Sequence, residues 1–288
     1  MKASYSTHVV LHSLLQECSA KSRADLIKQL SLNEREALES LPKPFGNPLQ
    51  EEDSVEVQLS RIHPSWISPF LRVLPEKEIG FFLSSLNPTQ AIPISKDLLF
   101  TSKLPSISLL AKSYFQKTLL GYLTAEIEEL LPISALPESP LNSLVNLKNV
   151  TFNQVLDHLG LYDISVELPQ IIEKKKLNKL YNSLTSSQLN YLKILLKRHQ
   201  PIPFARIGLV RWNEDPEKLR ALVRKMGAYR LGKALYGQNP SLIWHLLHKL
   251  EVERAFLVQK FSTPLKDHRI VLLIIRQILE FMTYIKEG

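Results

Sequence analysis

The stretch "NEDPEKLRALVRKMG", residues 213–227, decides the fold class because it signals both ends of a helix. Asp215 is a residue type that accepts backbone hydrogen bonds ahead of a helix, and Pro216 suits the first helical position, where no amide hydrogen is needed. The apolar positions that follow share one helix face: Leu219, Leu222, Val223 and Met226. Gly227 predicts the end of this helix.

The same start signals recur along the chain. Two segments open with a capping box, in which a hydroxyl residue stands three positions before Glu or Gln, and another opens with an Asn-Pro pair. These starts are Ser31 with Glu34, Thr185 with Gln188, and Asn239 with Pro240. Runs of alternating apolar and polar residues are scarce, and the nine glycines form no cluster. The sequence therefore predicts an all-α fold of short helices with negligible sheet.

Composition along the chain predicts three helical domains. A helix end, a break and a second helix recur at 26–41, 70–86 and 180–196, which favours a helical-repeat superhelix. Proline-rich and serine-rich stretches at 41–54 and 128–151 indicate linkers. We expect a small N-terminal domain at 1–45, a middle domain at 55–130 and a C-terminal domain at 150–288.

Charge is distributed unevenly between the two parts of the chain. Residues 1–170 carry 14 basic and 19 acidic side chains, whereas residues 171–288 carry 22 basic and 9 acidic ones. Such a basic portion suits an acidic protein, a nucleic acid or an anionic membrane face. The predicted partner-binding side chains on and after the helix at Pro216 are Arg220, Arg224, Lys225, Arg230 and Lys233.

Other features point away from a secreted or membrane-spanning protein. Cys18 is the single cysteine, which favours a reducing, cytosolic setting. The N-terminus lacks the pattern of a signal peptide. The longest apolar run, Ile270 to Ile275, is far shorter than the roughly 20 residues of a membrane helix. We expect this run to be buried beneath the other helices of the C-terminal domain.

No pattern in the sequence predicts catalysis. The serine, histidine and aspartate residues form no nucleophile motif, and no phosphate loop is present. His245 and His248 lie three positions apart, with Glu251 three further, a spacing that could present metal ligands on one helix face. Surface histidines on helices are common, so we expect no metal, no cofactor and no enzymatic activity. The three tryptophans are interpreted as core or groove anchors.

The stretch "RIHPSWISPFLRVLPEKEIGFFLSSLNP", residues 61–88, resembles the middle domain of FliG, the flagellar switch protein. In that family a Glu-His-Pro-Gln motif opens an armadillo-like helix set, and here His63 and Pro64 stand with Ile62 in place of Glu and Ser65 in place of Gln. Pro69 is expected to interrupt the following helix, because proline lacks a backbone donor. The resemblance implies that His63, Pro64 and Trp66 form a partner-docking corner; a capping role for His63 is the alternative.

Two more regions resemble FliG. Residues 14–41 are similar to its N-terminal domain, and the segments 215–237, 242–257 and 269–281 are similar to its C-terminal domain. The stretch "ERAFLVQKF", residues 253–261, keeps Arg254 but has Gln259 and Lys260 where the family presents acids to the stator. That departure favours the related SctK-type accessory role in type III secretion over torque generation.

The resemblance implies an armadillo-like, non-enzymatic scaffold of a membrane-associated ring machine. It implies that the N-terminal helices bind the cytoplasmic tail of a membrane-ring protein, that other surfaces recruit a cytoplasmic ring or sorting platform, and that stacked repeats support self-association. The protein would then be cytoplasmic and peripheral at the inner-membrane face. A nucleic-acid-binding protein that uses the basic C-terminal half is the alternative, although stacking aromatic residues between its basic side chains are not evident.

Overall fold

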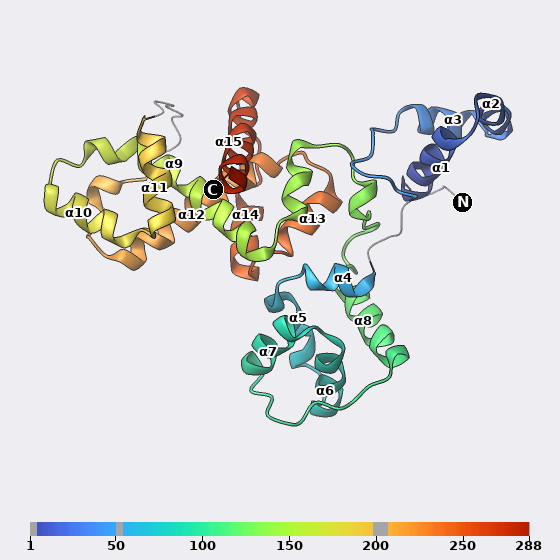
Figure 1. Ribbon diagram of the computed structural model, residues 1–288, viewed down its shortest axis with the longest axis horizontal. Helices are drawn as coiled ribbons and strands as arrows, with labels where there is room; N and C mark the ends of the chain where they lie inside the picture. Colours follow the sequence, from blue (N-terminus) through green and yellow to red (C-terminus); the bar gives the residue numbers. More distant parts are fainter. Residues whose placement is uncertain (1–4, 50–53, 198–206, 288) are drawn as a thin grey trace. The chain divides into compact units, whose positions relative to one another are not determined.

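The protein is helical throughout the part that the structure describes. The computed structural model describes residues 5–49, 54–197 and 207–287, and these ranges form 15 α-helices and four short 3-10 helices without a β-strand (Figure 1). The all-α prediction is thereby confirmed. Among the described helices, none combines the length and apolar composition needed to cross a membrane.

The helices divide into two compact units, and the chain passes from one to the other three times. Unit 1 comprises residues 1–146 and 238–251, and unit 2 comprises residues 147–237 and 252–288. Residues 238–251 therefore group with the N-terminal half, whereas the sequence places them in a C-terminal domain at 150–288. The division into domains at 1–45, 55–130 and 150–288 stays a prediction.

Unit 1 begins with three short helices and continues with a five-helix set. The first three are α1 (Tyr5–Glu17), α2 (Ala20–Gln29) and α3 (Leu32–Glu39). The set that follows is α4 (Val55–Ser60), α5 (Pro64–Arg72), α6 (Glu76–Ser85), α7 (Pro88–Asp97) and α8 (Leu109–Leu123). The 3-10 helices η1 (Ile133–Ala135) and η2 (Pro140–Asn146) and the distant α13 (Pro240–Leu247) complete the unit.

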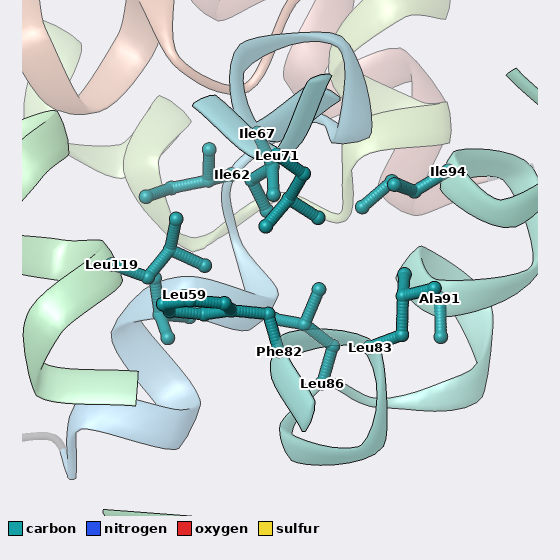
Figure 2. Packing of buried hydrophobic residues seen from close by; sticks show 10 residues of the cluster. All are labelled: Leu59, Ile62, Ile67, Leu71, Phe82, Leu83, Leu86, Ala91, Ile94 and Leu119. Atoms are coloured by element: carbon teal, nitrogen blue, oxygen red, sulfur yellow. The ribbon is translucent and has the colours of Figure 1, made fainter. Parts of the chain in front are cut away.

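The core of the five-helix set is a cluster of aliphatic side chains and one phenylalanine that point toward one another from α4 to α8 (Figure 2). Ile67, Leu71 and Ile94 are completely buried at its centre, and Trp244 of α13 packs against its edge. Burial of this apolar surface is the main force that holds such short helices together, because helices of this length are marginal alone.

Unit 2 is built around two long helices. Its elements are α9 (Asn149–Glu167), η3 (Leu168–Gln170), α10 (Lys174–Ser183), α11 (Ser186–Lys197), η4 (Leu209–Arg211), α12 (Pro216–Leu235), α14 (Val252–Phe261) and α15 (His268–Glu287). Helices α9 and α12 cross with their backbones almost touching. A methyl group at Gly160 would overlap the Val223 carbonyl, and one at Gly227 would overlap the Leu156 carbonyl.

The predicted helix starts are confirmed in atomic detail. Ser31 and Glu34 make a reciprocal capping box, and Thr185 and Gln188 exchange the same two hydrogen bonds. Asp215 and Asn239 accept backbone hydrogen bonds ahead of Pro216 and Pro240. The stretches 26–41, 70–86 and 180–196 each hold a helix, a break and a second helix, as expected.

Two predictions about breaks inside helices are wrong. Gly227 does not end α12, which continues to Leu235, because its missing side chain is what lets α9 approach. Pro69 does not interrupt α5, which runs from Pro64 to Arg72. The Pro69 ring lies on the exposed side, where it removes one backbone hydrogen bond without a clash against the core.

The two expected linkers are bonded to each other. The amide of Phe45 donates to the Leu136 carbonyl at 2.7 Å, and the amide of Glu138 donates to the Lys43 carbonyl at 2.8 Å. Leu141 and Leu144 within the second segment are completely buried. The described parts of these segments are thus packed structure, while residues 50–53 of the first lie outside the described residues.

The apolar run 270–275 is also placed differently from the prediction. Ile274 is completely buried, but Leu272 is 55% exposed. The run forms part of α15, and six consecutive apolar residues occupy every side of a helix, so they cannot all face the core. Helix α15 packs on α9 and α12, and Leu272 lies on a side that stays exposed.

Candidate interaction surfaces

The His-Pro corner, residues 63–66, contacts a segment of its own chain. The amide of His63 donates to the His248 carbonyl at 2.7 Å, and the Trp66 indole donates to the Leu250 carbonyl at 2.9 Å. The His63 imidazole accepts from the Ser65 amide and so caps α5, as the alternative interpretation holds. The His63 amide, the His63 imidazole and the Trp66 indole therefore all form hydrogen bonds within unit 1.

Three rings stack beside this corner. The His248 imidazole lies between the indoles of Trp66 and Trp244, with ring centroids 4.2 Å and 4.0 Å away. Its Nδ1 donates to the Trp244 carbonyl, which fixes the tautomer of a neutral ring. Burial between the two indoles, and to a smaller extent the nearby His245, lowers the pKa of His248 to about 4.

The neighbouring Lys249 is held in the same interior. Its amine donates to the Val145 carbonyl at 3.0 Å. Burial, with a smaller contribution from the charge of Arg61, lowers the pKa of Lys249 to about 8. His63 shifts in the same direction, since burial lowers its pKa against an opposing effect of Glu251. Residues 244–250 thus form the counterpart of the His-Pro corner, which the sequence did not pair with it.

The two histidines considered as metal ligands serve separate acceptors. His245 Nε2 donates to the Leu131 carbonyl at 2.9 Å, whereas His248 Nδ1 donates to Trp244 of its own helix. No group of three metal-ligating side chains gathers in the described ranges. The expectation that this pair binds no metal stays a prediction.

The basic residues predicted to bind a partner fall into two groups. Arg220, Arg224 and Lys225 are exposed on the first half of α12, where Arg220 forms an ion pair with Glu217. They are available to a partner. Because the pair is solvent-exposed, it contributes little to folding.

The other basic residues predicted to bind a partner are bonded within unit 2, where Arg230 and Lys233 are buried and Arg254 is half-buried. Arg230 is 1% exposed and makes a two-pronged ion pair with Asp163, at 2.7 Å and 2.8 Å. Lys233 is buried and donates to the Thr263 carbonyl, and burial lowers the pKa of its amine. Arg254 bonds Asn153 and Asp157 of α9.

A signal for the burial of Arg230 was present in the sequence. Arg230 continues the apolar stripe of Leu219, Val223 and Met226 at helical spacing, so it must face the core. A buried arginine needs an acid, and Asp163 lies within the apolar run "LGLYDISV", residues 159–166. Each of the two charged residues interrupts an apolar pattern, and each supplies the opposite charge that the other needs when buried.

The three N-terminal helices enclose a pocket of about 220 Å3. Leu15, Ile27 and Leu38 supply apolar lining, and the polar lining beside them comprises His12, Gln16, Arg23, Arg35 and Glu39. It is a candidate docking site, because a concave apolar surface with a few fixed polar groups is what recognition sites share.

Both pocket arginines are fixed by the ends of helices. Arg23 donates to the Leu15 and Gln16 carbonyls near the end of α1, at 2.7 Å and 2.8 Å. Arg35 repeats the arrangement at the end of α2, where it donates to Lys28 and Leu30. These carbonyls have no hydrogen-bond partner within their helices, so the guanidinium groups satisfy them and join each helix to the next.

Comparison of the chain with protein-family models, with curated proteins and with solved structures gives no match. The likeness to FliG, and the armadillo-like superhelix that it implies, stay predictions.

Proposed function

We propose that the protein is a non-enzymatic scaffold that links a membrane ring to a cytoplasmic ring or sorting platform, as a flagellar-switch-like or SctK-type component. The observation that carries this proposal is the pocket between α1, α2 and α3. Its apolar lining suits the apolar side chains of a peptide segment, and its two guanidinium groups and the Glu39 carboxylate suit charged side chains of both signs beside them. In the proposal this segment is the cytoplasmic tail of the membrane-ring protein.

The His-Pro corner has a supporting role in this proposal. Its hydrogen bonds to His248 and Leu250 join two parts of unit 1 that lie far apart in the sequence. These contacts hold α5 and the α13 segment together within unit 1. The exposed Arg220, Arg224 and Lys225 offer the second surface, for an acidic component of the cytoplasmic ring. The armadillo-like stacking of helices and the location at the inner-membrane face belong to the same proposal.

The test is affinity capture of the full chain from detergent-solubilised membranes of the producing cells, with mass spectrometry of the bound proteins. We expect an oligomeric membrane-ring protein to be recovered. Ile27→Asp should abolish its recovery, because the new carboxylate enters the apolar lining. Leu32→Asp is the matched control, since Leu32 is exposed and does not line the pocket.

Two results would contradict the proposal. The first is recovery of the ring protein in equal amounts with Ile27→Asp and wild type. The second is tight binding of double-stranded or single-stranded nucleic acid that weakens steeply with salt, which would favour the nucleic-acid alternative.

A further inference from the structure

Helix α8 is apolar on two opposite sides. On one side Leu119 is completely buried, and Phe115, Leu120 and Leu123 pack against the core of the five-helix set. The other side carries Leu110, which is 83% exposed, and Tyr114, which is 64% exposed. Large apolar side chains that a helix leaves exposed side by side are typical of a surface that another element covers. Folding of the described chain covers only the first side.

The exposed side has the spacing of a helix–helix seam. Leu110, Tyr114, Lys117 and Gly121 follow one another at steps of four, three and four residues. This is the spacing at which one helix faces another along its length. We call these four residues the α8 seam.

Gly121 adds room for a second backbone. No atom lies within 4 Å of the position that a side chain at Gly121 would occupy. A glycine costs helix stability, and nothing within the described chain uses the space that it leaves. At a seam position, such a space admits the close approach of a partner helix.

The charged side chains of α8 itself are both lysines, and the acid beside them, Glu56 of α4, is paired with Lys112. Residues 98–125 contain no Asp or Glu, and their charged side chains are Lys103, Lys112 and Lys117. Lys112 is paired with Glu56 at 2.9 Å, whereas Lys117 is exposed within the seam. The complementary surface therefore has an apolar stripe with a carboxylate that meets Lys117.

We propose that the α8 seam binds an amphipathic helix of an acidic partner protein. The seam spacing selects a helix as the occupant, the leucine and tyrosine side chains anchor its apolar stripe, and Lys117 selects an acidic residue beside that stripe. This surface is separate from the α1–α3 pocket on which the proposed function rests.

The test uses the full chain and a fluorescein-labelled, designed helical peptide with a leucine stripe flanked by glutamates. Fluorescence anisotropy should show saturable binding. Leu110→Asp and Lys117→Glu should each weaken it by at least about tenfold, because each places a carboxylate against the peptide. A second peptide with lysine flanks should bind wild type weakly and Lys117→Glu more tightly.

Two variants separate recognition from folding. Gly121→Gln replaces glycine by a better helix former in open space, so the melting temperature should not fall, while peptide binding should weaken by at least about tenfold. Ile172→Asp introduces the same charge at another highly exposed apolar position, in unit 2, and should leave binding unchanged. Ile27→Asp should also leave it unchanged, so this proposal and the proposed function fail separately.

Four outcomes would overturn the proposal. The first is that the acidic peptide shows no saturable binding, and the second is that wild type and Leu110→Asp bind it equally. The third is that the protein binds phosphatidylglycerol vesicles but not the peptide and that Leu110→Asp abolishes vesicle binding; the fourth is that Leu110→Asp converts a dimer to a monomer in sedimentation equilibrium. The third result would assign the seam to a lipid surface, and the fourth would assign it to a second copy of the chain.

Discussion

At the scale of single residues, His248 couples the stability of unit 1 to pH. Its pKa is about 4 in the folded chain and has the ordinary value of 6.5 when unfolded. Above pH 6.5 the ring is neutral in both states. As the pH is lowered from 6.5 to 4, His248 binds a proton in the unfolded chain but stays neutral in the folded chain. The free energy of unfolding therefore decreases as the pH decreases, by up to about 3 kcal/mol in total. Burial of His63 and His158 acts in the same direction.

We predict that His248→Phe makes stability less sensitive to acid. The phenyl ring can occupy the space between Trp66 and Trp244 but takes up no proton. Urea unfolding at several pH values between about 7 and 4 should show a steep loss of stability for wild type and a shallower one for the variant. Parallel loss in both proteins would mean that other groups control the acid response.

Arg230 and Arg220 both belong to α12, but their substitution should change the free energy of unfolding by very different amounts. Arg230→Met leaves Asp163 buried without its cation, and we expect the free energy of unfolding to fall by about 3–5 kcal/mol. Reversal of the exposed Arg220 and Arg224 to Glu should change stability by less than about 1 kcal/mol and should weaken association with an acidic partner at low salt. Urea denaturation of both variants gives the comparison, and equal losses would contradict the assignment of Arg230 to the interior.

At the scale of helices, two glycines inside helices, Gly227 and Gly121, should respond in opposite ways to substitution by alanine. Gly227→Ala forces α12 away from the Leu156 carbonyl of α9, and overpacking of this kind costs about 1–3 kcal/mol. Gly121→Ala adds a methyl group in open space and should stabilise α8 by about 0.5–1 kcal/mol. Thermal unfolding should therefore shift down for the first variant and up for the second. A rise for both would show that α9 and α12 do not meet as described.

Helix starts could be predicted from the sequence because capping is local. Ser31 and Thr185 need only a residue three positions ahead, and the structure contains both capping boxes. Gly227 and Pro69 were wrongly interpreted as breaks for the opposite reason. Whether a glycine ends a helix or admits a neighbour depends on what crosses it, and α9 lies about 70 residues earlier in the chain.

The interaction surfaces follow the same division. The exposed position of Arg220 could be predicted from helical spacing, because it depends on one helix only. The counterpart of the His-Pro corner could not, since Trp66 bonds a carbonyl 184 positions away in the chain. Likewise, the exposure of Leu110 depends on which helices pack against α8, and the spacing of residues within α8 does not determine that.

At the scale of the whole molecule, residues 238–251 join unit 1 although α12 and α14 on either side of them belong to unit 2. Trp244 packs against the core of the five-helix set, and Lys249 donates to Val145. A cut that follows the linear sequence therefore separates this segment from the residues that bury it.

We predict that a fragment of residues 200–288 does not fold cooperatively by itself. It lacks α9, which covers the Val223 and Gly227 face of α12, and it exposes Trp244. Far-UV circular dichroism should show reduced helix and no sharp thermal transition.

Co-expression of a tagged fragment 1–146 with a fragment 147–288 tests whether residues 238–251 belong to unit 1. The two fragments should co-purify, because residues 238–251 of the second supply α13 to the first. Trp66→Ala should weaken this association, since it removes both the hydrogen bond to Leu250 and the stacking on His248. A monomeric 200–288 fragment with a cooperative melt, together with no co-purification of the two larger fragments, would show that the C-terminal part folds without unit 1.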